Sequence, residues 1–138
     1  MLEARLNEKE AIEEREEVIR QNIANEKEAN RNLKNAQDRM KVIDGNIETI
    51  KKALAEAEKD AAAAAKTGTK DTKEFDEKIA QIRKDLAKAE EERKDQLIAI
   101  AIADENRKAV IIRNANALVE NETKILELNA TIERLKAA

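Results

Sequence analysis

The amino-acid sequence predicts an all-α protein, a long antiparallel two-helix coiled-coil hairpin. Three observations lead to this prediction. Charged residues make up 41% of the 138 residues, with one aromatic residue, two glycines, and no proline, cysteine or histidine. A single strong turn signal divides the chain into two segments of equal length, residues 1–66 and 73–138. Both segments carry a seven-residue repeat of apolar side chains, which indicates helices that pack along one seam.

The first arm is expected to be one helix over residues 1–66. Its repeat consists of two series of positions, three or four residues apart. One series holds Ile12, Ile19, Glu26, Leu33, Met40, Ile47, Leu54 and Ala61, and the other holds Arg15, Asn22, Ala29, Ala36, Ile43, Ile50, Ala57 and Ala64. The segment Asp44–Gly45–Asn46 resembles a turn. The repeat crosses it without a change of phase, so the sequence predicts a continuous helix.

Residues 67–72 are expected to form the turn, which is the tip of the hairpin. This segment contains Thr67, Gly68, Thr69 and Lys70, residue types that suit a tight connection. Asp71 or Thr72 can then cap the helix that follows.

The second arm is expected to be a helix over residues 73–138. Folding the chain at the turn places Ala57 beside Ile82, Leu54 beside Leu86, and Ile50 beside Ala89. Large residues then mostly face small ones, as close packing requires. Its two seam series run through Phe75, Ile82, Ala89, Gln96, Ala103, Val110 and Ala117, and through Ile79, Leu86, Arg93, Ile100, Arg107, Asn114, Asn121, Leu128 and Leu135.

The seam is polar near the chain ends. Asn22, Glu26, Asn114 and Asn121 fall on it, and the expected register places Glu26 near Asn114 and Arg113. Two interpretations stand for the asparagines: they face water, or they form buried layers that fix the register of the coiled coil.

A second apolar stripe runs along the second arm beside the seam. It comprises Leu97, Ile111, Leu118, Ile125 and Ile132, with Ile112, Val119 and Leu126 next to it. A two-helix hairpin surrounded by water has no use for such a stripe. The sequence therefore predicts an interface with another chain, in a four-helix or larger bundle.

The residue types argue against catalysis and against bound cofactors. Without histidine or cysteine, most metal sites and nucleophilic triads cannot be built. Basic and acidic residues alternate, so a nucleic-acid surface is not expected. No apolar run is long enough to span a membrane, and the first residues do not resemble a signal peptide. A soluble, cytoplasmic or virion-associated protein is expected.

These observations favour a non-catalytic structural protein that assembles with itself or with another helical protein. Long charged hairpins occur in phage scaffolding and structural proteins and in the receptor-binding rods of bacteriocins; the likeness is one of architecture, and no motif carries it. A phage virion, scaffold or filament component fits the first hypothesis. The alternatives are a monomeric rod or adaptor that engages a partner at its tip, and a designed helical protein. The irregular seam argues against design.

The hairpin makes a prediction about distance. Spin labels at residues 7 and 132 should report a short separation within one chain, because both positions lie at the end opposite the turn. Pulsed electron resonance measures this distance. A separation near the full length of one arm, on the order of 100 Å, would mean that the chain does not fold back.

Overall fold

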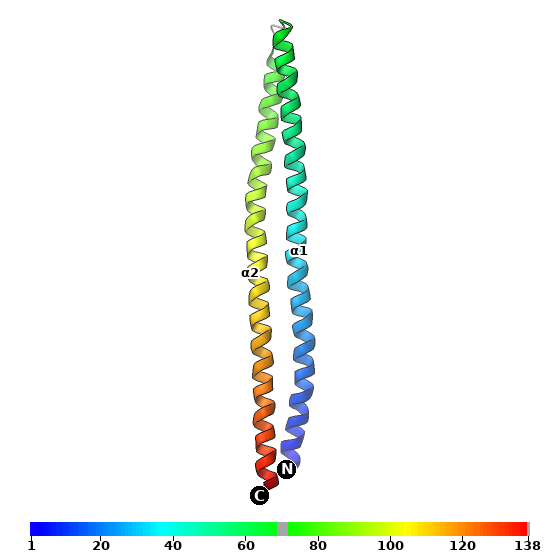
Figure 1. Ribbon diagram of the computed structural model, residues 1–138, viewed down its shortest axis with the longest axis vertical. Helices are drawn as coiled ribbons and strands as arrows, with labels where there is room; N and C mark the ends of the chain where they lie inside the picture. Colours follow the sequence, from blue (N-terminus) through cyan, green and yellow to red (C-terminus); the bar gives the residue numbers. More distant parts are fainter. Residues whose placement is uncertain (69–71, 138) are drawn as a thin grey trace. The chain divides into compact units, whose positions relative to one another are not determined.

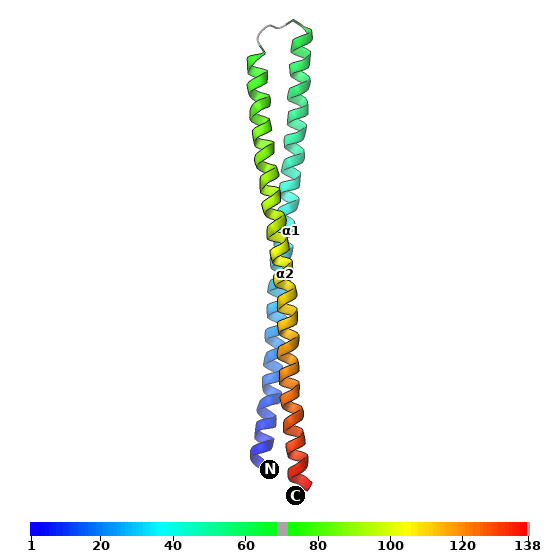
Figure 2. The ribbon, with the colours of Figure 1, turned by 90° about the vertical axis from the view of Figure 1, so that its left-hand side faces the viewer.

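In the computed structural model, which describes residues 1–68 and 72–137, the chain forms two helices. Helix α1 spans Leu2–Lys66 and helix α2 spans Lys73–Ala137, with no strand among the described residues. Figure 1 shows α1 and α2 running side by side in opposite directions, and Figure 2 shows the pair turned by 90°. The prediction of an all-α hairpin is thereby confirmed.

The turn signal ends α1 and begins α2 where expected. Gly68 has a φ of 77°, the left-handed conformation that commonly follows a helix end, and its N–H donates to the carbonyl of Ala65 at 3.2 Å. The carbonyl of Thr72 accepts the first backbone hydrogen bond of α2, from the N–H of Asp76 at 2.9 Å. Thr72 is therefore the residue that caps α2. The predicted tip residues Thr69 and Lys70, and Asp71, lie outside the described residues.

The chain divides into two compact units, each containing part of both helices. Unit 1 comprises Met1–Leu33 and Ala103–Ala138, and unit 2 comprises Lys34–Ile102.

Unit 2 follows the predicted repeat except at Arg93, which was expected on the seam and is exposed. Ile43, Ile47 and Ala89 form a buried cluster, against which Ile50 and Leu86 pack. Two ion pairs join the helices across the edges of this core: Arg93 with Asp44 at 2.8 Å and Arg83 with Glu58 at 3.4 Å. The other buried side chains of unit 2 are Met40, Ala57 and Gln96.

Unit 1 departs from the predicted seam. Ala11 is completely buried and Val18 is half-buried, whereas Ile12 and Ile19, expected on the seam, are 39% and 40% exposed. In α2, Ile132 is buried in place of Leu135, which is exposed. The inward stripe therefore lies one residue earlier in this part of α1 than the repeat predicted.

The shift arises where each helix takes two successive steps of four residues. In α1 the inward residues are Val18, Asn22, Glu26 and Ala29; in α2 they are Val110, Asn114, Leu118 and Asn121, with Ala117 also half-buried. A regular heptad alternates steps of three and four. Two fours in succession are a stutter, which locally unwinds the coiled coil and rotates the inward stripe.

The structure resolves the conflict at Gly45. Helix α1 is continuous there, and a Cβ added at Gly45 would meet open space. The conformational cost of glycine inside a helix is therefore not balanced by any packing advantage.

The two glycines give opposite predictions. Gly45→Ala should stabilise the protein by about 0.5–1 kcal/mol and raise the thermal unfolding midpoint by a few degrees. Gly68→Ala, the matched control, should lower the midpoint because alanine is strained at a positive φ. Thermal unfolding followed by circular dichroism measures both shifts. A lower midpoint for Gly45→Ala would contradict a continuous α1.

Candidate interaction surface

Two asparagines join α1 and α2 within the segments that contain the stutters. The side-chain amide of Asn22 donates to the carbonyl of Asn114 at 3.0 Å, and the amide of Asn114 donates to the carbonyl of Asn22, also at 3.0 Å. Asn114 is 4% exposed and Asn22 is half-buried. A residue with inward neighbours four positions on either side lies at the middle of the stripe, so both side chains face the opposite helix. Asn114 thus pairs with Asn22, while Glu26 is half-buried.

A second polar contact lies nearer the chain ends. Asn121, 5% exposed, donates to the carbonyl of Ala11 at 3.2 Å, and its Oδ1 is buried with no hydrogen-bond partner among the described residues. Beside it, Lys124 and Glu14 form an ion pair at 3.1 Å. The small side chain of Ala11 lets the amide of Asn121 reach the backbone of α1. The sequence left open whether the seam asparagines face water or form buried polar layers. Asn114 and Asn121 form buried polar layers.

The buried residues of unit 1 include little large apolar surface. Among its described residues they are Ala11, Ala29, Asn114, Asn121 and Ile132. Only Ile132 has a large aliphatic side chain. Most of the larger aliphatic side chains of unit 1 therefore remain partly or largely in contact with water.

Six exposed aliphatic residues of unit 1 share a simple relation to its core. Each follows an inward residue by one position. They are Ile12, Ile19 and Ile23 in α1 and Ile111, Val119 and Leu126 in α2, with exposed fractions from 39% to 67%. We call these six residues the apolar face.

The six residues of the apolar face lie on one side of the helix pair. One residue is about 100° of helical rotation. Because α2 runs opposite to α1 and faces it, residues that follow core residues come to the same side in both helices. One groove of unit 1 agrees with this geometry. It is lined by residues of both helices that each precede an inward residue, among them Asn25, Glu28, Asn106 and Arg113. Residues that follow inward residues must then lie on the opposite side.

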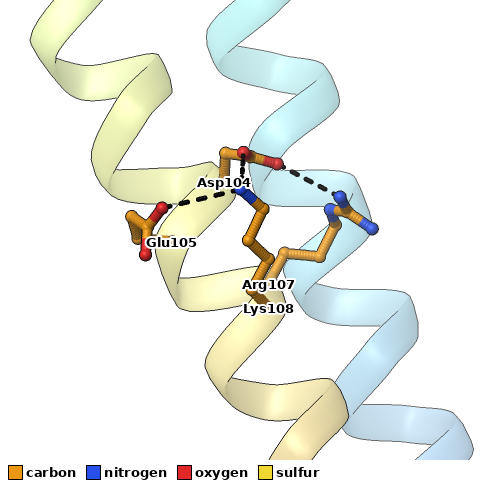
Figure 3. A network of polar contacts seen from close by, with 4 residues as sticks. All are labelled: Asp104, Glu105, Arg107 and Lys108. Atoms are coloured by element: carbon orange, nitrogen blue, oxygen red, sulfur yellow. Dashed lines mark hydrogen bonds and ion pairs between the residues drawn. The ribbon is translucent and has the colours of Figure 1, made fainter.

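Charged residues border the apolar face. Arg5 and Glu133 line a groove near the chain ends. Near Ala103, where the α2 part of unit 1 begins, Asp104 accepts hydrogen bonds from Arg107 at 3.1 Å and from Lys108 at 3.2 Å. Lys108 also contacts Glu105 at 3.6 Å (Figure 3). The bonds from Lys108 and Arg107 lower the pKa of the Asp104 carboxyl, and Asp104 raises the pKa of Lys108. An apolar area with a charged rim is typical of a docking surface.

The stripe expected from the sequence is only partly available to a partner. Leu97, in unit 2, and Ile111 are exposed, whereas Leu118 and Ile125 are half-buried. Ile132 is 6% exposed and packs within unit 1, where an intermolecular contact was expected, because the stutter turns it inward. The contribution of α1 to the apolar face was missed, since Ile12 and Ile19 were assigned to the seam.

Other kinds of site find little support in the described residues. No group of three or more acidic side chains there is arranged to hold a metal ion. The carboxylates of Glu13, Glu14, Glu16 and Glu17 and those of Glu90–Glu92 are exposed. No described helical segment combines the length and apolarity needed to cross a bilayer.

Comparison with protein-family models, with curated protein sequences and with solved structures finds no match for this chain. The interaction surface therefore has to be interpreted from its own residues.

The Asn22–Asn114 pair predicts a specific loss of stability. Asn114→Ala removes a buried hydrogen bond and should cost about 1–2 kcal/mol of unfolding free energy. Asn116→Ala, an exposed asparagine of the same helix, is the matched control and should change stability by less than about 0.5 kcal/mol. Urea unfolding at one fixed protein concentration measures both values. Equal effects at the two positions would show that the buried pair does not stabilise unit 1.

Proposed function

We propose that this chain is a non-catalytic structural protein that assembles with copies of itself through the apolar face. The observation that carries the proposal is the distribution of aliphatic side chains in unit 1. Its buried residues are mainly alanine and asparagine, while six isoleucine, valine and leucine side chains lie exposed on one side. Soluble monomers rarely expose a contiguous apolar area of this kind without a partner for it.

Burial of these side chains supplies a plausible driving force. Covering a fully exposed aliphatic side chain is worth roughly 1.5–3 kcal/mol. The six residues are about half exposed, so each retains roughly 1 kcal/mol that a partner could provide. A second hairpin would supply the same number of residues, and the association would convert two weakly packed helix pairs into one bundle with a larger core.

The geometry also supports helical rather than extended partners. The apolar face combines side chains from α1 and α2, which lie side by side in opposite directions. Along each helix, successive residues of the face are four, seven or eight positions apart. Such spacings present rows of side chains that fit into the grooves of another helix pair. The two helices already satisfy their own backbone hydrogen bonds, so a partner adds side-chain packing and no backbone pairing.

The test removes the apolar character of the face with little effect on folding. Replacing Ile23, Val119 and Leu126 with serine should shift the protein towards smaller species, because these side chains are 60% to 67% exposed within the single chain. Light scattering coupled to size-exclusion chromatography measures the mass.

A closely matched control exists in unit 2. Val42, Ile98 and Ile102 are 59% to 65% exposed, and their replacement with serine makes the same change in polarity. This variant should keep the mass of the unmodified protein. A monomeric unmodified protein at tens of micromolar, or an unchanged mass in the first variant, would refute assembly through the apolar face and favour the monomeric rod.

A further inference from the structure

We infer that unit 1 is the part of the hairpin that opens, and that assembly holds it closed. In a single copy the two helix segments of unit 1 separate more often than those of unit 2. A second copy on the apolar face then keeps them together, and this second step rests on the proposed function, whereas the first does not. The packing of unit 1, its residue types and its place in the chain carry the inference.

The α1 segment of unit 1 contributes little apolar surface to the seam. Among its inward residues, Val18 and Leu33 are aliphatic and larger than alanine, and both are half-buried. Its other inward residues are Ala4, Glu8, Ala11, Asn22, Glu26 and Ala29. The α2 segment brings larger side chains inward, such as Leu118, Ile125 and Ile132, and these face a row of mainly small and polar residues. Because apolar burial drives helix pairing, this seam holds its helices weakly.

Unit 2 has larger side chains from both helices on its seam. Ile43 and Ile47 of α1 are buried with Ala89 of α2, and Ile50 and Leu86 pack against this cluster. Separation of the helices of unit 2 would expose the whole cluster to water. Opening is therefore less favourable in unit 2 than in unit 1.

The polar contacts of unit 1 fix its register and add only modest resistance to opening. The amides of Asn22, Asn114 and Asn121 bond carbonyls of the opposite helix. On separation these amides bond to water instead, so the net stability gained from each bond is modest. Glu14 and Lys124 are about half exposed, and an ion pair so close to water contributes little.

Asparagine is concentrated in unit 1. Ten of the twelve asparagines of the chain lie there, five in each helix segment, whereas unit 2 holds Asn35 and Asn46. Asparagine forms helices less readily than alanine, and unit 2 contains five consecutive alanines at residues 61–65. Once the segments of unit 1 separate, each depends on this weaker intrinsic helicity, so their backbone amides become accessible to water.

The order of the units along the chain lets unit 1 open alone. Unit 2 is one continuous segment, and residues 67–72 connect its two helices. This short connection keeps the helices of unit 2 near each other, so they re-associate readily after any separation. The two segments of unit 1 are connected through the whole of unit 2. They can therefore part as a local opening while unit 2 remains closed.

A second copy acts on this opening because the apolar face is complete only when unit 1 is closed. Three of its residues come from α1 and three from α2, so separation of the segments divides the face. A partner that covers both helices binds the closed form in preference to the open one. Assembly therefore lowers the frequency of opening by mass action.

Hydrogen exchange of the full chain, followed by mass spectrometry, tests the inference away from the helix ends. In a solution dilute enough for light scattering to report single copies, amides near Asn22 and Asn114 should exchange at least roughly tenfold faster than those near Ile47 and Leu86, after correction for intrinsic rates. In a concentrated solution of the assembled protein, exchange in unit 1 should slow and exchange in unit 2 should change little.

The outcomes separate the inference from the proposed function. Equal protection of both units in single copies would overturn the opening of unit 1. Fast exchange of unit 1 within an assembly would overturn its closure by a second copy. A monomeric mass at every concentration would refute the proposed function, while the exchange rates would still decide whether unit 1 opens.

The two serine variants used to test assembly provide a matched pair. Replacement of Ile23, Val119 and Leu126 changes side chains that are 60% to 67% exposed and leaves the inward residues of unit 1 in place. In concentrated solution this variant should exchange in unit 1 as fast as single copies of the unmodified protein. The variant changed in unit 2 should keep the slow exchange of the assembly. Slow exchange of unit 1 in a monomeric apolar-face variant would overturn the inference, because unit 1 would then be closed without a partner.

Discussion

The reciprocal hydrogen bonds between Asn22 and Asn114 mark the constraint on which the organisation of unit 1 depends. Asn22 sits at the middle of the stutter in α1, with inward residues four positions before and after it, and Asn114 lies opposite it in α2, between Val110 and the half-buried Ala117 and Leu118. Two stutters that coincide rotate the inward stripe of both helices at the same level, so the helices stay in register with each other. A stutter in one helix alone would turn its apolar stripe away from its neighbour.

The shift determines which side chains unit 1 keeps inside. It brings Ala11 and Asn121 inward and leaves Ile12 and Ile19 partly exposed beside Val119 and Leu126 on the side of the apolar face. Unit 2, without a stutter, buries Ile43 and Ile47 in a conventional coiled-coil core. The two units therefore differ in their interiors: unit 2 buries a cluster of large aliphatic side chains, whereas the buried residues of unit 1 are mainly alanine and asparagine. Polar layers fix register at a cost in stability, and assembly through the apolar face would offset that cost.

Sequence reasoning predicted the helices, the turn and the core of unit 2, because the repeat there is anchored by large residues such as Met40, Ile47 and Leu86. It failed in unit 1 for a physical reason. A seven-residue repeat runs through Ile12 and Ile19, which are exposed, and no strongly apolar residue lies on the expected seam between Ile19 and Leu33 to fix its phase. Helical periodicity alone cannot separate a core stripe from an interface stripe one residue away, since both are apolar. The asparagine pairing also depends on the exact register, which the polar residues of this segment left undetermined.

The central claim is that the hairpin completes its hydrophobic core by binding a second copy, and the concentration dependence of its thermal stability tests this most directly. Association that is specific to the folded state raises the unfolding midpoint by mass action as the protein concentration increases. Calorimetry from a few micromolar to several hundred micromolar should therefore show a steadily rising midpoint. A midpoint that stays constant over this range would contradict the account, because unit 1 would then be stable with its apolar face in water.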